Sequence, residues 1–329
     1  MDLVVYYDKD YPTWWISRSI SQQIVNFLVQ KNFNVKNAND LAVWMEKAVD
    51  TKTAYDSLVV FSQDVFPDTI YHSPSPSCLA RLFLDSGGTI VWVGDNPFYY
   101  QGLSSAKVQG MKQEELKQAI LSGVMAQNSA GEVAFHFNIG GPYGALGIIP
   151  VFMHSPSDQV KVTKKGISFG LKTAWYGNRP IIKQGETLHR KLSVLGSSKP
   201  IFPISVKKIL LQSEVEKGIS VPKVLSSFSD LLGLAPAVVT IIAIAVSFVK
   251  GWLAANYVYF VIAAIISALV YGGYWYLRRR ETFASAWFKN YNDSFPDSGF
   301  LRIWDFQPFR ITNEMLEDLY KVCINRSKK

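Results

Sequence analysis

The chain has 329 residues, of which 48% are hydrophobic and 18% charged, with 34 lysine and arginine residues against 26 aspartate and glutamate residues. These values exclude a disordered chain, a collagen-like chain and a disulfide scaffold, because the apolar fraction is high and two cysteines form at most one bridge. They also exclude a transporter with many spans, whose apolar residues would be spread along the whole chain. Here both the charges and the apolar residues are unevenly distributed.

The first 138 residues predict strands that alternate with helices. Strand patterns cover residues 3–7, 33–35, 57–62, 89–93 and 132–138, and helical periodicity covers residues 14–30, 41–49, 77–85 and 112–126. Apolar strands that alternate with helices are buried on both faces of a sheet. The pattern therefore predicts an α/β fold with a parallel sheet.

The loops that follow the predicted strands contain acidic residues where such sheets bind ligands. Asp8, Asp10, Asp64 and Asp95 could gather there around a divalent cation, but solvated loop carboxylates are the favoured interpretation. The glycine-rich stretch at residues 140–147 lacks the Gly-Lys-Ser/Thr ending of a phosphate loop, so a turn is predicted. We therefore predict neither a metal site nor a cofactor.

Basic residues are concentrated in the next part of the chain. Residues 1–156 carry 10 basic and 14 acidic side chains, whereas residues 157–223 carry 13 basic and 4 acidic side chains. Such a stretch beside a membrane would bind anionic lipid headgroups; nucleic acid and a plain solvated face are the alternatives. With the basic residues that follow the apolar segment, the predicted headgroup-binding set is Lys161, Lys164, Lys165, Lys207, Lys208, Arg278, Arg279 and Arg280.

Two uncharged segments follow, at residues 231–249 and 256–277, and each is long enough to cross the roughly 30 Å hydrocarbon layer. Lysines and arginines flank the pair on both sides, so the positive-inside rule predicts a transmembrane hairpin in the cell membrane with both termini cytoplasmic. In that compartment Cys78 and Cys323 would be reduced thiols. Small residues recur every four positions and predict helix packing between the spans, at Ala243, Ser247, Gly251, Ala264, Ala268 and Gly272.

The last part of the chain, residues 278–329, predicts a small cytoplasmic segment rich in aromatic residues, which would pack on the N-terminal domain or bind a protein partner. It ends in an amphipathic helix that Thr312 can cap. The predicted domains are thus an α/β domain at 1–200, a basic connector at 201–230, the hairpin at 231–277 and the segment at 278–329.

Three phrases in the N-terminal part resemble the glutamine-amidotransferase-like, flavodoxin-like family: VVFSQDV, LDSGGTIVWVGDNPFYYQG and TKKGISFGLKTAWYGNRPI. The resemblance covers roughly residues 1–200. An active member carries a nucleophilic cysteine in a sharp strand-to-helix turn, with a histidine as base. In this chain the turn reads Gly94-Asp95-Asn96, and Cys78 lies one element earlier. We therefore predict an inactive domain and no enzyme activity.

The whole arrangement resembles the membrane effectors associated with short prokaryotic Argonaute proteins in archaeal antiviral defence. The resemblance implies an abortive-infection toxin: a cytoplasmic Argonaute-type complex senses invading nucleic acid and activates this protein. The protein would then bind anionic phospholipids, form homo-oligomers and depolarise the membrane, with no direct contact to nucleic acid. The alternatives are a membrane-anchored amidotransferase-like enzyme acting on an envelope or lipid-linked substrate, and a purely structural anchor that recruits a soluble complex.

Overall fold

The computed structural model describes residues 1–148, 150, 159–177, 181–182, 192–198, 283–305 and 311–327. These residues belong to one compact unit, Met1–Ser198 together with Thr282–Lys329. The remaining unit, Lys199–Glu281, lies outside the described residues, and so do the predicted connector and hairpin within it.

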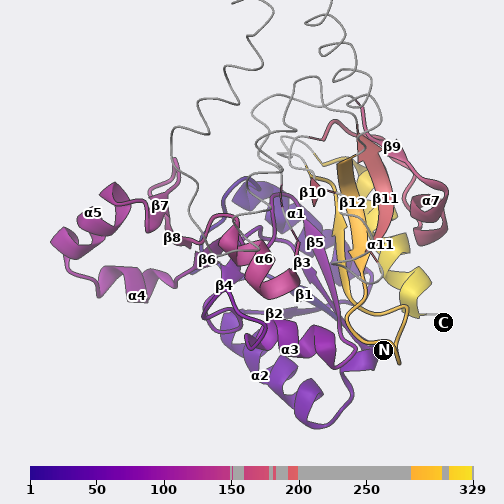
Figure 1. Cartoon of the computed structure of the whole chain (residues 1–329), viewed down its shortest axis with the longest axis horizontal. Coiled ribbons are helices and arrows are strands. Elements are labelled where there is room, and N and C mark those ends of the chain that lie inside the picture. Colours follow the sequence, from indigo (N-terminus) through magenta and orange to yellow (C-terminus); the bar gives the residue numbers. More distant parts are fainter. Residues whose placement is uncertain are drawn as a thin grey trace, which may run out of the picture. The chain divides into compact units, whose positions relative to one another are not determined.

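The described unit is built on a sheet with the strand order β2-β1-β3-β5-β13-β12-β11-β9, in which β10 also pairs with β12 (Figure 1). Its strands are β1 (Asp2–Tyr6), β2 (Asn34–Lys36), β3 (Ser57–Phe61), β5 (Thr89–Val93), β9 (Lys161–Val162), β10 (Ile181–Ile182), β11 (Leu192–Ser198), β12 (Phe283–Lys289) and β13 (Phe300–Ile303). Strands β2, β1, β3, β5 and β13 are parallel, whereas β12, β11 and β9 add in antiparallel order. The predicted α/β fold with a parallel sheet is confirmed.

The C-terminal residues are part of this sheet. Strand β13 pairs in parallel with β5, Leu301 opposite Val91, and β12 continues the sheet on the other side of β13. All four residues of β13 are buried, including Arg302, because both faces of the sheet are covered. The boundary drawn between an α/β domain at 1–200 and a separate segment at 278–329 is therefore corrected, since the two parts share one sheet.

Helices cover both faces of the sheet: α1 (Arg18–Gln30), α2 (Ala38–Asp50), α3 (Leu79–Asp85), α7 (Lys164–Phe169) and α11 (Asn313–Ser327), with a short 3₁₀ turn at Ala54–Asp56. Successive residues of β3 point to opposite faces. Val59 and Phe61 pack in a core with residues of α2 and α3, whereas Leu58 and Val60 pack in a second core with residues of α1 and α11. Thr312 caps α11 as predicted, accepting from the backbone N–H of Met315 at 3.2 Å.

A second, smaller sheet has the order β4-β6-β8-β7 and consists of β4 (Phe66–Pro67), β6 (Tyr100–Gly102), β7 (Met125–Gln127) and β8 (Val133–His136). Between β6 and β8 the chain makes an excursion, residues 103–132, which we call the arm; it contains α4 (Ser105–Gln109) and α5 (Gln113–Leu121) and projects to one side in Figure 1. The helix predicted over 112–126 ends earlier, because Gly123 adopts a φ of +75° and Met125 then pairs with Phe135.

The glycine-rich stretch forms a short helix, α6 (Gly140–Leu146), and not the predicted turn. Its glycines allow close backbone packing, since a Cβ at Gly141 would overlap the Phe98 carbonyl and one at Gly144 would overlap the Pro74 carbonyl. Gly147 ends the helix with a φ of 62°.

Candidate functional site

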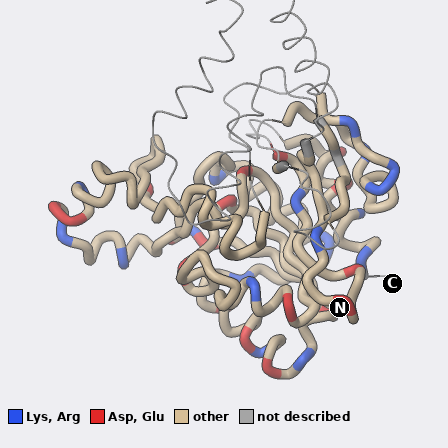
Figure 2. Tube along the Cα trace, viewed as in Figure 1, with Lys and Arg blue, Asp and Glu red and all other residues tan. Residues whose placement is uncertain are grey.

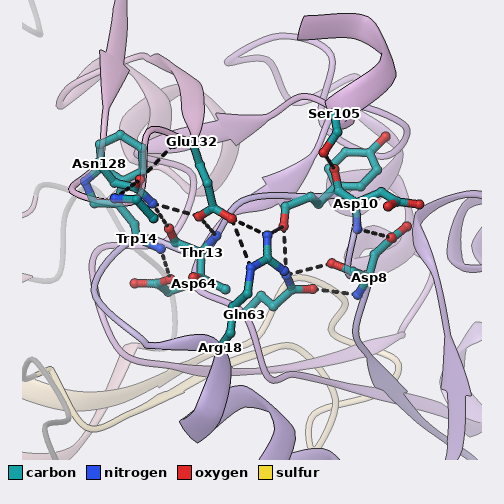
Figure 3. Close-up of polar contacts among 12 residues, drawn as sticks. Asp8, Asp10, Thr13, Trp14, Arg18, Gln63, Asp64, Ser105, Asn128 and Glu132 are labelled. Carbon is teal, nitrogen blue, oxygen red and sulfur yellow. Dashed lines mark hydrogen bonds and ion pairs between the residues drawn. The ribbon is translucent and has the colours of Figure 1, made fainter. Parts of the chain in front are cut away.

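The carboxyl ends of β1, β3, β5 and β13 lie at one edge of the sheet, because these strands are parallel. We call it the carboxyl edge; in α/β sheets it is the edge where ligands bind. The loops that the sequence singled out, at residues 7–10, 62–64 and 94–97, meet here. The space above the edge holds the chain's own loop between β1 and α1, residues 8–17, and Figure 3 shows the polar contacts that hold it.

Asp64 holds the middle of this loop. Its carboxylate accepts the backbone N–H groups of Trp14, Trp15 and Ile16 at 2.8, 2.6 and 3.1 Å, and only 1% of its surface is exposed. Burial raises the pKa of Asp64 to about 7, which the three N–H donors oppose and the nearby Asp95 carboxylate reinforces. Because these three amides face the carboxylate, they do not form a helical turn. The helix predicted from Trp14 therefore starts at Arg18, after the Ser17 cap.

Two further contacts fix the ends of the loop. Gln63 accepts the N–H of Asp8 at 2.7 Å and donates to the Asp8 carbonyl at 3.0 Å. Arg18 forms an ion pair with Glu132, at the end of the arm, through both Nε and Nη2. Glu132 also accepts the N–H of Thr13 at 3.2 Å, so one carboxylate joins the arm, the loop and α1 (Figure 3). We call the Arg18–Glu132 pair the clamp.

The acidic residues that the sequence singled out for a cation make other contacts at this edge. The carboxylates of Asp8 and Asp64 accept backbone N–H groups, and Asp64 and Asp95 are buried instead of solvated as the sequence suggested. Within the residues that the structure describes, no group of three or more His, Cys, Asp or Glu side chains could hold a metal ion. The carboxylates of Asp8 and Asp64 thus order the loops of this edge.

Both cysteines are buried in the described unit. Cys78 precedes α3 and is fully buried, and burial raises the pKa of its thiol to about 11. Cys323 is buried in α11, and burial raises the pKa of its thiol to about 12. Since the thiolate is the nucleophilic form, neither thiol is activated at neutral pH.

The chain leaves and re-enters the described unit at one point. Ser198, the last residue of β11, pairs with Phe283, the first residue of β12. Because β12 is antiparallel to β13 and β11 is antiparallel to β12, this pair lies at the carboxyl edge. We call the Ser198–Phe283 pair the exit point.

Three of the predicted headgroup-binding residues lie in β9 and at the start of α7. Lys161 pairs with Ser197, one residue from the exit point, and Lys164 and Lys165 begin the short helix α7 beside β11. All three side chains are exposed, and lysines of this region are drawn in blue in Figure 2. We call these three lysines the basic surface.

The other predicted site residues lie outside the described residues: Lys207, Lys208, Arg278, Arg279, Arg280, Ala243, Ser247, Gly251, Ala264, Ala268 and Gly272. Among the helices that the structure does describe, none has the length and apolar character needed to cross a bilayer.

Sequence reasoning did not find the clamp. Arg18 and Glu132 are 114 residues apart, and neither belongs to a recognisable motif. Sequence reasoning did not find the exit point either, because β11 and β12 are separated in the sequence by the predicted membrane segment and no local pattern indicates that they pair.

Comparison with known proteins gives a partial match. The model of the MJECL34 family matches residues 1–135, a range that contains the loop, the clamp and the arm but not the basic surface. The chain is also 41% identical over 101 residues to the uncharacterized protein MJECL34 of Methanocaldococcus jannaschii, a match that covers 30% of this chain. The chain therefore spans about a third (34%) of the length of this curated relative. No solved structure matches the chain.

Proposed function

We propose that this protein is a membrane effector of an antiviral abortive-infection system. In this proposal a cytoplasmic, Argonaute-type complex that senses nucleic acid activates it. The activated protein binds anionic phospholipids and assembles into homo-oligomers, and its spans depolarise the membrane and kill the infected cell. The proposal combines the resemblance stated above with the geometry of the exit point.

The exit point is the observation that carries the proposal. Because β11 and β12 are adjacent antiparallel strands, Ser198 and Phe283, the residues on either side of residues 199–282, are paired. A segment that crosses a bilayer twice returns to the side from which it started, whereas one or three crossings would separate its ends by the membrane thickness. The pairing of Ser198 with Phe283 therefore agrees with two spans and with both termini on one side.

The basic surface, which begins at Lys161 beside the exit point, supports lipid binding. Each cation close to an anionic bilayer contributes about 1 kcal/mol. Lys161, Lys164 and Lys165 together would contribute about 3 kcal/mol, which corresponds to about a hundredfold in apparent affinity. Nucleic acid is a less suitable anion here, because the predicted spans would keep the exit point near the headgroups.

The carboxyl edge favours an effector over an amidotransferase-like enzyme. Loop 8–17 occupies this edge and is held there by Asp64, Gln63 and the clamp. The buried thiol of Cys78, with its raised pKa, lacks the properties of a nucleophile. A sensor or scaffold domain needs neither an open edge nor a nucleophile, and so it fits these features better.

The experiment coexpresses the full chain with its candidate Argonaute-type complex and follows membrane potential with a voltage-sensitive dye after an invading plasmid is supplied. Activation should depolarise the cells that carry the wild-type chain. A variant with Lys161→Gln, Lys164→Gln and Lys165→Gln should depolarise them weakly and lose about a hundredfold in apparent affinity for phosphatidylglycerol in mixed micelles.

The matched control replaces three exposed lysines far from the basic surface, Lys47, Lys52 and Lys117, by glutamine. It removes the same charge and should behave as the wild type. Unchanged potential and normal growth after activation of the wild-type chain would refute the effector function. Equal losses in the two triple variants would refute the role of the basic surface.

A further inference from the structure

A tyrosine stands at the carboxyl edge beside the basic surface. The backbone N–H of Val160 donates to the Trp175 carbonyl at 2.7 Å, and Gln159 forms an isolated antiparallel bridge with Tyr176. Lys161 is opposite Ser197 in the neighbouring ladder. Gln159 and its partner Tyr176 therefore lie two residues beyond Lys161, on the side towards which the chain leaves at Ser198.

The backbone that carries Tyr176 is held from both sides. The N–H groups of Lys172 and Thr173 both donate to the buried Asp318 carboxylate at 2.7 Å. The indole N–H of Trp175 donates to the buried Asp305 at 2.8 Å. The residue after the tyrosine is a glycine, Gly177, at which a Cβ would overlap that same Asp305 carboxylate.

Tyr176 is nevertheless 65% exposed, whereas its neighbour Trp175 is 5% exposed. An aromatic ring on a mobile loop could fold back onto the protein, but these contacts fix the direction of the segment. The ring of Tyr176 thus stands in solvent on a rigid support, next to the exposed Lys161. Tyrosine, with an apolar ring and a polar hydroxyl, is enriched at the headgroup level of membranes.

Covalent geometry limits how far this edge can be from the lipid. Leu277, the last residue of the second predicted span, is six residues before Phe283. Six residues extend over at most about 20 Å, and each headgroup layer is roughly 5–8 Å thick. If residues 256–277 cross the bilayer, the exit point therefore stays close to the headgroups.

We propose that Tyr176 is an interfacial anchor that inserts its ring into the headgroup layer of an anionic bilayer, with Lys161 binding headgroup phosphates beside it. This inference rests on the proposed membrane function and adds to it a fixed contact that orients the α/β domain. Tyr176 supplies an apolar ring and Lys161 a positive charge, and this combination matches the interface of an anionic bilayer.

The test attaches an environment-sensitive fluorophore to a Tyr176→Cys variant of the full chain in phosphatidylglycerol nanodiscs. The matched control is Val43→Cys on α2, because Val43 is also 65% exposed. Cys78 and Cys323 are buried, and labelling of the wild-type chain gives the background. We expect a blue-shifted emission and loss of fluorescence with shallow doxyl lipids at position 176, and neither effect at position 43.

Resistance of the full chain to alkaline carbonate extraction is measured in parallel, and it reports the predicted spans. If the chain resists extraction but the label at 176 behaves like the label at 43, the anchor is refuted and the membrane function stands. If the chain is extracted, both proposals fail. If the label at 176 is shielded only when the activating complex is added, Tyr176 contacts protein and the anchor is likewise refuted.

Discussion

Asp64 is the residue on which the carboxyl edge depends, and its replacement by asparagine isolates that role. Asp64→Asn keeps the size of the side chain but turns one acceptor oxygen into an NH₂ donor. In the wild-type protein one carboxylate oxygen accepts from Trp14, and the other accepts from Trp15 and Ile16. The amide can therefore satisfy either one or two of the three N–H groups.

The better orientation of the asparagine leaves one buried N–H, that of Trp14, opposite an NH₂ group. A buried donor without an acceptor costs about 1–3 kcal/mol. Asp64→Ala removes all three acceptor contacts and should cost more than Asp64→Asn. The stability of the wild-type protein also depends on pH. Because the pKa of Asp64 is raised from 3.8 to about 7, the folded protein keeps a proton on Asp64 between these two pH values, whereas the unfolded chain has released it. The wild-type protein should therefore lose stability relative to Asp64→Asn as the pH rises from about 4 to about 7.

Thermal unfolding in mild detergent measures the stability, and hydrogen exchange measures the loop directly through the amides of Trp14, Trp15 and Ile16. We expect a lower melting temperature and faster exchange of these amides in Asp64→Asn. The control is Asp10→Asn, an exposed change in the same loop that should stay within about 0.5 kcal/mol of the wild type. Wild-type melting temperature and exchange in Asp64→Asn would show that the carboxylate does not hold the loop.

Two further predictions concern the clamp and a buried lysine. Glu132→Gln weakens the partly exposed ion pair with Arg18 and should lower the free energy of unfolding by about 1 kcal/mol. Hydrogen exchange in the arm should become faster in this variant. The control is Glu114→Gln, an exposed change on α5, which should leave the exchange unchanged. Burial lowers the pKa of Lys289 to about 7, so the unfolded chain binds the extra proton and stability should rise between about pH 7 and 10. Lys289→Met should flatten that rise in melting temperature, and an unchanged slope would contradict the assignment.

Local patterns predicted much of the sheet. The apolar runs at Leu3–Tyr7, Ser57–Ser62 and Thr89–Val93 correspond to β1, β3 and β5, because buried parallel strands are continuous apolar stretches. Capping also had a local signal, since Thr312 precedes the helix whose N–H it accepts. These features depend on residues close together in the chain.

Long-range pairing explains what was missed. Nothing in FLRI indicates that Phe300–Ile303 pairs with a strand made about 200 residues earlier, or that the buried Arg302 guanidinium donates to the Gly94 carbonyl. The start of α1 was placed too early for the same reason, since the three amides before it bind Asp64, about 50 residues away. The clamp likewise joins residues that only the fold brings together.

Because β13 lies between β5 and β12, the sheet can be completed only after residues 300–303 have been synthesised. At roughly 5–20 residues per second, the ribosome needs about 10–40 s to pass from Val93 to Phe300. During that time β5, with its sequence TIVWV, has an edge without its partner, and the predicted spans are synthesised before the partner arrives. An unpaired apolar edge is a site of aggregation. If residues 231–277 insert into a membrane, they are synthesised before the sheet is complete, and a chain truncated before residue 300 would expose this edge permanently.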